Sequence, residues 1–159
     1  MILILLGTQN KPNQRILNDV ASLIDNKKIK EEVIAQTGCT EYKNDKMTLF
    51  DYIKHEEMDE LIEKASVVII HGGVGSITNA VKKGKKVIVA PRYKKYGEHV
   101  NDHQLQITKE FVEKGYVLPY YDGDNLLDII KKAKKFKPNK YESNKKNFAK
   151  AIEKYIESL

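Results

Sequence analysis

Two clusters of polar residues hold the side chains best suited to chemistry in this chain. Residues 71–76 read His-Gly-Gly-Val-Gly-Ser, and residues 98–104 read Glu-His-Val-Asn-Asp-His-Gln. The first cluster follows the β-branched run 67–70 and precedes a helical pattern, so the free N–H groups of a helix start would converge there. The helix dipole adds partial positive charge, and the combination suits a phosphate. The second cluster is rich enough in polar groups to bind a sugar.

The elements that position these clusters are predicted by the spacing of apolar residues. Short aliphatic runs predict strands, and stripes at helical spacing predict helices between them. This alternation indicates the α/β class, a Rossmann-like parallel sheet with helices on both faces. Ligands bind such sheets at the carboxyl ends of the strands, where both clusters fall. The predicted strands are 2–6, 32–35, 47–50, 67–70, 86–90 and 116–118, and the predicted helices hold the stripes 16–24, 58–65, 77–81, 105–112 and 126–133.

The length of 159 residues suits one domain with a sizeable core, followed by an amphipathic helix at its end. Residues 1–6 are apolar but lack the basic flank and the length of a signal sequence. No apolar run approaches the roughly 20 residues of a membrane helix. Cys39 is the single cysteine, so no intrachain disulfide can form, which favours a reducing compartment.

The positive charge of the chain is concentrated near its C-terminus. Residues 131–154 contain ten lysines and two glutamates, a balance of +8, whereas the whole chain carries +6, so the remainder sums to −2. This segment is either a solvated lysine face or a surface that attracts an anionic membrane or an acidic partner. Nucleic acid is disfavoured as a partner, because Arg15 and Arg92 are the only arginines and no basic–aromatic stacking pattern occurs.

Several common nucleotide and metal motifs are missing. A dinucleotide-binding fingerprint would place a small residue where Thr78 stands and an acidic residue after the next strand, so a nicotinamide-binding domain is disfavoured. No Gly-Lys-Ser/Thr phosphate loop occurs. Residues 122–124 read Asp-Gly-Asp and mimic an Asp-x-Asp metal motif, but they lie at a predicted helix start. No metal site is therefore predicted.

The combination of motifs is more specific than any single one. The chain resembles the C-terminal, donor-binding half of GT-B glycosyltransferases, and within them the small catalytic subunits of two-component UDP-sugar enzymes. Such subunits serve capsule and exopolysaccharide synthesis, often as β-1,4-galactosyltransferases, or the dolichol-linked N-acetylglucosaminyltransferase. The resemblance extends from residue 1 to about 120. The segments that carry it are 7–8 (Gly-Thr), 35–38 (Ala-Gln-Thr-Gly), 71–76, 84–86 (Gly-Lys-Lys), 91–92 (Pro-Arg) and 97–104.

The resemblance implies that residues 71–76 hold the diphosphate of a UDP-sugar. His71 would donate to a phosphate oxygen, Gly73 and Gly75 would let the backbone approach, and Ser76 would add a hydroxyl. Gln104 would bond the hydroxyls of the donor sugar. The expected substrate-binding residues are Gly7, Thr8, Gln36, Tyr52, His71, Gly72, Gly73, Val74, Gly75, Ser76, Asn79, Arg92, His103 and Gln104.

Three of these positions leave alternatives open. Asn79 stands where many GT-B enzymes place a glutamate on the ribose hydroxyls, and its amide oxygen accepts without the assistance of charge. Arg92 would bind phosphate or pair with Glu98, because a guanidinium suits bidentate contacts. The uracil would lie against the loop 50–55, on Tyr52 or Ile53, unless these residues belong to the core.

Catalysis requires a group that takes the proton of the acceptor hydroxyl. Glu98, His99 and Asp102 are the candidates, because a poised carboxylate or imidazole can act as a general base. The sequence does not choose among them. In many GT-B enzymes the base comes from the other half of the enzyme.

The resemblance therefore implies an inverting UDP-sugar hexosyltransferase that uses no cofactor and no metal ion. Residues 1–136 would form the nucleotide-sugar-binding domain, and the amphipathic helix within 137–159 would pack on it or on a partner subunit. The protein would be cytoplasmic and peripheral at the inner face of the membrane, through a membrane-associated partner that holds a lipid-linked acceptor. The alternatives are a nucleotide-sugar-binding accessory subunit without catalysis and a 2-epimerase, which the chain length disfavours.

Overall fold

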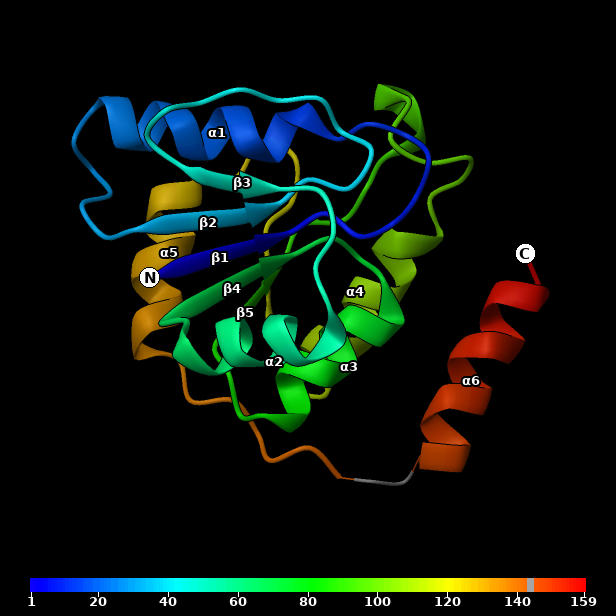
Figure 1. Ribbon diagram of the computed structural model, residues 1–159. Helices are drawn as coiled ribbons and strands as arrows, with labels where there is room; N and C mark the ends of the chain where they lie inside the picture. The colour runs from blue at the N-terminus through cyan, green and yellow to red at the C-terminus, as the bar shows by residue number, and fades with distance from the viewer. Residues whose placement is uncertain (143–144) are drawn as a thin grey trace.

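The computed structural model describes residues 1–142 and 145–159, with side chains for all of these except 145–149. Strands and helices alternate along the chain, as the apolar spacing predicts (Figure 1). In order they are β1 (Ile2–Leu5), α1 (Gln14–Asp25), β2 (Val33–Gln36), β3 (Thr48–Phe50), α2 (His55–Lys64), β4 (Val67–Ile70), α3 (Val74–Lys82), β5 (Val87–Val89), the 3-10 helix η1 (Lys94–Tyr96), α4 (His103–Glu113), β6 (Leu118–Pro119), α5 (Leu126–Lys135) and α6 (Lys145–Glu157).

The strands form one parallel sheet in the order β3-β2-β1-β4-β5-β6. The chain moves outward from β1 to β3 and then returns to add β4 on the other side of β1. Strand order reverses between β1 and β4, so the connections after these two strands pass to opposite faces and open a crevice between them. The predicted parallel α/β class is confirmed.

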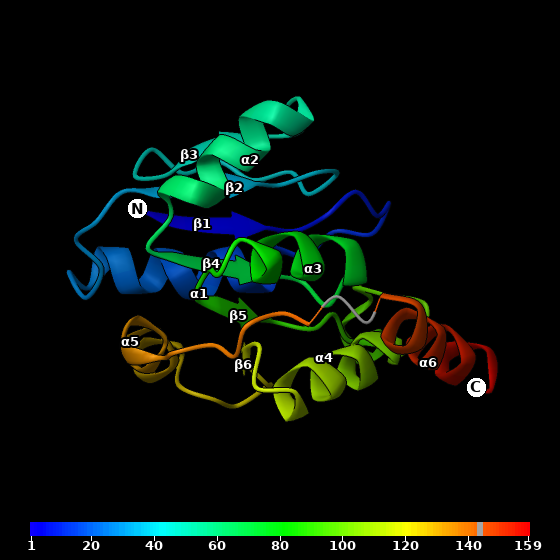
Figure 2. The ribbon, with the colours of Figure 1, turned by 90° about the horizontal axis from the view of Figure 1, so that it is seen from below.

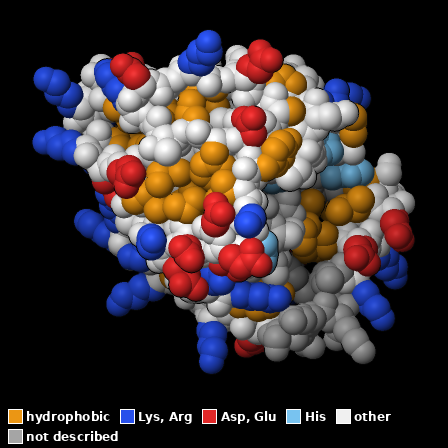
Figure 3. Space-filling view, viewed as in Figure 1, with side chains coloured by type: hydrophobic (Ala, Val, Ile, Leu, Met, Phe, Trp, Pro, Cys, Tyr) orange, Lys and Arg blue, Asp and Glu red, His pale blue; other side chains and the backbone are white. Residues whose placement is uncertain are grey.

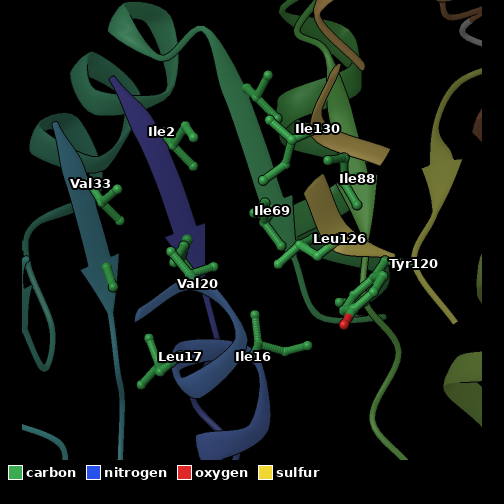
Figure 4. Packing of buried hydrophobic residues seen from close by; sticks show 14 of the residues in the cluster. Ile2, Ile16, Leu17, Val20, Val33, Ile69, Ile88, Tyr120, Leu126 and Ile130 are labelled. Atoms are coloured by element: carbon green, nitrogen blue, oxygen red, sulfur yellow. The ribbon is translucent and has the colours of Figure 1, made fainter. Parts of the chain in front are cut away.

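Helices cover both faces of the sheet, with α1 and α5 on one face and α2, α3 and α4 on the other (Figures 1 and 2). Side chains of β1 alternate between the faces: Ile2 and Ile4 pack toward α1 and α5, and Leu3 and Leu5 pack toward the other helices. Figure 4 shows the first of these cores, where aliphatic side chains of the strands meet those of α1 and α5. The sheet is therefore a rigid support for the loops at its ends.

The predicted element boundaries differ from the structure chiefly around the last strand. A strand was expected at 116–118, whereas β6 is Leu118–Pro119. Gly115 has a φ of +73° and lets the chain turn back on α4, where the Tyr116 N–H donates to the Phe111 carbonyl. Tyr116 and Val117 are buried in this turn, so their apolar character reflects core packing and not strand pairing.

The terminal helix α6 packs on the α3 and α4 side of the domain, as both ribbon views show (Figures 1 and 2). Ile152 is buried in the core cluster there, whereas Tyr155 and Leu159 are 47% and 64% exposed. Phe148, which belongs to the predicted amphipathic helix within 137–159, lies outside the side chains that the structure describes. Within residues 1–142 and 145–159, no helix has both the length and the apolarity needed to cross a membrane.

Candidate functional site

A cavity of about 570 Å³ opens at the carboxyl ends of β1 and β4, where the strand order reverses. Figure 3 shows histidine side chains on this side of the molecule, beside a hollow. Among the described residues, none that lines the cavity is an aspartate, glutamate, lysine or arginine. The lining residues are Leu5, Gly7, Thr8, Gln9, Gln36, Ile53, His55, Met58, Ile62, His71, Gly73, Gly75, Ser76 and Asn79.

His71 lies directly after β4 and is 6% exposed. Its Nδ1 lies 3.2 Å from Nε2 of Gln104. The other amide atom of Gln104, Oε1, accepts hydrogen bonds from the backbone N–H groups of Gly72 at 2.9 Å and Arg92 at 3.0 Å. Because both of these partners are donors, Oε1 is the amide oxygen, and Nε2 must donate to His71 Nδ1. The neutral imidazole therefore carries its proton on Nε2.

Two glycines provide the space for the His71 ring. A Cβ atom on Gly7 would collide with His71 Nε2, and one on Gly73 would collide with His71 Cε1. Gly7 also has a φ of +78°, a conformation that costs other residues roughly 1–2 kcal/mol. Both glycines line the cavity, so the Nε2–H group of His71 is held at its wall.

The first turn of α3 supplies further donors. The helix begins at Val74, and Gly73 precedes it without a side-chain cap. The N–H groups of Val74, Gly75 and Ser76 have no acceptor within the helix because of their position in its first turn. Gly75 and Ser76 line the cavity. Among the described residues, no atom outside the adjoining backbone of α3 lies within 4 Å of the place where a Gly75 Cβ would stand, so packing does not require glycine there.

Burial lowers the pKa of His71 to about 4, and the nearby positive charge of Arg92 acts in the same direction. The imidazole is therefore neutral at physiological pH. Together with the α3 N–H groups, it presents hydrogen-bond donors and a helix dipole without a full charge. Such an arrangement suits an anion whose negative charge is spread over several oxygens, such as a diphosphate.

Asn79 lines another part of the cavity and is held by a carboxylate outside it. Its Nδ2 donates to Asp59 Oδ1 at 3.1 Å, which leaves the amide oxygen as an acceptor. That hydrogen bond lowers the pKa of Asp59, and His55 lies 3.4 Å from the second carboxylate oxygen. A negative charge is thus present on α2, on the carboxylate of Asp59 next to the Asn79 amide.

Glu98 belongs to the second polar cluster, but its carboxylate is fully engaged. It is 3% exposed, and Arg15 donates to both of its oxygens at 3.1 Å. The Tyr93 N–H donates to it as well, at 3.1 Å, and the Arg15 guanidinium lies over the Tyr93 ring. Glu98 does not line the cavity. The structure gives this residue an anchoring role in the loop after β5, in place of the predicted role as a base.

Arg92 is 1% exposed and donates to three backbone carbonyl groups. These are Leu6 at 2.6 Å, Lys11 at 2.7 Å and Glu98 at 3.0 Å. The guanidinium satisfies buried carbonyls of two loops, and its bond to Glu98 goes to the backbone carbonyl of that residue and not to its carboxylate. A contact of Arg92 with phosphate stays a prediction. Arg92 fixes the loop after β1 to the loop after β5.

The remaining members of the second cluster lie beside the cavity and not in its lining. His99 Nδ1 accepts from the Asn101 N–H at 3.2 Å. Its Nε2 lies 3.0 Å from the side-chain Nε2 of Gln9, a residue that does line the cavity. Asp102 Oδ1 accepts from the Lys94 N–H at 2.9 Å. A role for His99 or Asp102 as the base stays a prediction.

The structure brings together a majority of the predicted substrate-binding residues. Those that line the cavity are Gly7, Thr8, Gln36, His71, Gly73, Gly75, Ser76 and Asn79. Those that do not are Tyr52, Gly72, Val74, Arg92, His103 and Gln104. Tyr52 is 55% exposed, and its neighbour Ile53 lines the cavity instead. Gln104 is buried and acts on the cavity through His71.

Sequence reasoning missed the contribution of α2 to the cavity. Met58 and Ile62 follow a helical apolar stripe, which predicts core packing and gives no signal of a ligand site. His55 and Gln9 also line the cavity; a polar residue in a loop after a strand was the available signal for Gln9. In the described part of the chain, no group of three or more His, Cys, Asp or Glu side chains is placed to hold a metal ion.

The whole chain, residues 1–159, matches the family described as "Glycosyltransferase family 28 C-terminal domain". The chain belongs to this family. It is a GT-B C-terminal domain and resembles the ALG13 type of small subunit. The predicted family and fold are therefore confirmed, and the chain is a glycosyltransferase domain.

This family 28 domain is similar to two curated relatives and to two solved structures. It is 32% identical over 76 residues to the human "UDP-N-acetylglucosamine transferase subunit ALG13" and 28% identical over 76 residues to the mouse protein of that name. Each match covers 48% of this chain and 6% of the relative, so the match spans a small part of those proteins.

The structural matches support the fold. The NMR solution structure of ALG13 has a TM-score of 0.58 and 20% identity, and the match covers 95% of this chain and 93% of that one. The glycotransferase of kitacinnamycin has a TM-score of 0.60 and 14% identity over 84% of this chain and 34% of its own. At these identities the likeness shows a shared architecture.

Proposed function

We propose that this chain is the donor-binding, catalytic subunit of an inverting glycosyltransferase. It would move a hexose from a UDP-sugar to a lipid-linked acceptor in polysaccharide or glycolipid synthesis. One observation carries the proposal: the His71 Nε2–H and the first N–H groups of α3 converge on a cavity at the strand switch point. Membership in a glycosyltransferase family directs this anion site to a nucleotide-sugar donor.

In the proposed reaction, an oxygen of the acceptor hydroxyl attacks the anomeric carbon of the donor sugar. The bond from that carbon to the β-phosphate oxygen breaks on the opposite face, so the configuration inverts and UDP leaves with the bonding electrons. The charge that develops on the diphosphate is stabilised by the fixed donors of His71, Gly75 and Ser76. Because these donors are already in place, the scheme uses no cofactor and no metal ion.

The acceptor hydroxyl must also lose a proton. Glu98 is engaged by Arg15, and both ring nitrogens of His99 already have partners in this chain, Asn101 at Nδ1 and Gln9 at Nε2. We assign the base to the acceptor-binding partner. Asp102 is the candidate that this chain itself offers.

The partner is proposed to be a membrane-associated subunit that binds this chain at the cytoplasmic face. The name of the relative ALG13 describes a transferase subunit, which supports a two-component enzyme. Tyr155 and Leu159 on α6 are exposed apolar side chains that suit such a contact. The terminal helix would then pack on the domain through Ile152 and on the partner through its outer face.

The experiment is co-expression with the partner subunit, followed by transfer of radiolabelled sugar from UDP-sugars to membrane lipid acceptors. His71→Ala should abolish most of the transfer, and His103→Ala, outside the cavity, should leave it close to wild type. Calorimetry with UDP should show binding to the wild-type chain. If UDP binds but His71→Ala transfers sugar at the wild-type rate, the chain is a nucleotide-sugar-binding accessory subunit and the catalytic assignment fails.

A further inference from the structure

A second cavity, of about 900 Å³, lies at the opposite end of the sheet. It forms where α3 ends, where β5 begins and where the chain leaves α5. Its floor is apolar and consists of Val81, Phe136, Pro138 and Tyr141. Its rim carries lysines and, among the described lining residues, no carboxylate. We name it the lysine groove after Lys82, Lys86, Lys134, Lys135, Lys137 and Lys140.

Half of these lysines have contacts within the domain. The Lys134 ammonium pairs with Glu31 at 2.5 Å, and Lys86 donates to the Lys134 carbonyl. Lys82 lies 5.6 Å from the centre of the Tyr141 ring. Within the described part of the chain, no contact pairs the ammonium groups of the other three, Lys135, Lys137 and Lys140. Figure 3 shows Lys and Arg side chains along the left and lower margins, on the side of α5.

The negative ends of the nearby helix dipoles do not balance the positive charge of these lysines. The C-terminal ends of α3 and α5 both lie at the groove. Each end carries roughly −0.5 of an elementary charge, so the two together balance about one lysine. Glu31 balances Lys134. Of the six lysines, about four therefore remain in excess at one concave site.

We propose that the lysine groove binds an acidic peptide segment of a protein partner, with an apolar side chain on the floor and carboxylates at the rim. The site is concave, which suits an inserted side chain and not a flat bilayer. Its volume falls within the range of about 300–1,000 Å³ that is typical of ligand sites. The lysines are separate point charges without an arginine fork, which suits carboxylates spread along a chain better than one phosphate.

This binding would be independent of the donor site. The groove is at the amino ends of the strands and the cavity with His71 is at their carboxyl ends, so both can be occupied at once. The inference therefore extends the proposed function without resting on it.

The test uses the full chain and a fluorescent synthetic peptide in which glutamates flank one tryptophan. Lys135→Glu combined with Lys137→Glu should weaken binding about tenfold or more, equivalent to about 1.4 kcal/mol. The matched control combines Lys43→Glu with Lys94→Glu, which makes the same charge change at exposed positions away from the groove. It should weaken binding by less than about twofold, because distant exposed charges are screened by salt. The same peptide with serine in place of tryptophan should bind weakly.

Three results would overturn the proposal. Equal losses in both double variants would show non-specific attraction, and equal binding of the serine peptide would show that the apolar floor is not used. Binding of phosphatidylglycerol vesicles that the groove variant loses, without peptide binding, would assign the groove to a membrane. Thermal unfolding and UDP calorimetry on each variant separate a folding defect, or failure of the donor site, from failure of the groove.

Discussion

The cavity at the carboxyl ends of the strands and the lysine groove at their amino ends both suit anions, but by different means. In the cavity, a neutral imidazole and the backbone N–H groups of a helix start supply the donors. In the groove, lysine ammonium groups supply full charges. The net charge of +6 therefore says little about where a nucleotide binds, because the candidate donor site lies in the part of the chain that carries no excess of positive charge.

The two regions also differ in how far they are organised before a ligand arrives. His71 is held by Gln104 on one side and by two glycines on the other, so its donor atom is fixed. Fixed dipoles stabilise developing charge without reorganisation, which is what a transferase needs at its leaving group. Lysine side chains lose considerable conformational entropy when they are ordered, so a site made of them suits a reversible contact.

The largest effect on UDP binding is expected from a substitution of Gly7, which lines the cavity, and the matched control is Gly84, which lines the lysine groove. Gly7 and Gly84 both have positive φ, at +78° and +70°, so an alanine at either costs roughly 1–2 kcal/mol of stability. The new Cβ at position 7 collides with His71, whereas a Cβ at position 84 meets no described atom within 4 Å apart from its chain neighbours. Gly7→Ala should reduce UDP affinity about a hundredfold or more by calorimetry, because it displaces the imidazole and also shifts the loop that lines the cavity, whereas Gly84→Ala should bind normally. Similar UDP affinities in the two variants would contradict the assigned role of the imidazole.

Removal of the imidazole itself should have the next largest effect. A hydrogen bond to a charged group contributes about 1.5–3 kcal/mol, so His71→Ala should weaken UDP binding by roughly ten- to a hundredfold. The peptide affinity of the lysine groove should stay unchanged in this variant. His103→Ala, at the start of α4 outside the cavity, is the matched control and should bind UDP as the wild type does. A comparable loss in both histidine variants would mean that the site is wrongly placed.

The salt dependence of binding should be stronger at the lysine groove, which offers full charges, than at the cavity, which offers hydrogen-bond donors and a helix dipole. Between ionic strengths of about 0.05 and 0.5 M the Debye length shortens severalfold, so peptide binding in the groove should weaken about tenfold. UDP-sugar binding in the cavity should weaken by less than about threefold, because its donors are short-range hydrogen bonds in a partly enclosed site. Equal salt dependence at both sites would remove the distinction between them.

The smallest effect is expected from pH. A histidine with an ordinary pKa would gain charge, and attract a diphosphate more strongly, as pH falls through 6.5. The pKa of His71 is lowered to about 4, so its charge appears only as pH approaches that value. UDP-sugar affinity should therefore stay constant between pH 8 and about 5.5. A rise of about tenfold over this range, measured by calorimetry, would show that the imidazole is protonated on binding.

The sheet and much of the cavity could be predicted from sequence because they depend on local patterns. The aliphatic runs of β1 and β4 mark buried parallel strands, and the residues after them, Gly7 and His71, must then lie at the same edge. The resemblance to a known family pointed to the same loops. The family and fold were confirmed.

The second polar cluster was harder to predict, since its roles depend on contacts across the chain. Glu98 is paired with Arg15, 83 positions away, and Arg92 donates to the Leu6 carbonyl, 86 positions away. Nothing local in the sequence distinguishes a buried anchor from an exposed catalytic group. Met58 and Ile62 line the cavity, but their apolar spacing is the same as that of an ordinary core helix. The sequence therefore gives no sign of their contact with the cavity.

Gln104 decides, from another helix, which nitrogen of His71 faces the cavity with a proton. A glutamate at this position would offer acceptors alone, and the oxygen opposite His71 would require a proton on Nδ1. The imidazole would then lose its Nε2–H or become a cation. A glutamine codon becomes a glutamate codon through a single base change. One mutation at a residue that does not line the cavity would therefore remove the Nε2–H donor of His71 or give the imidazole a positive charge.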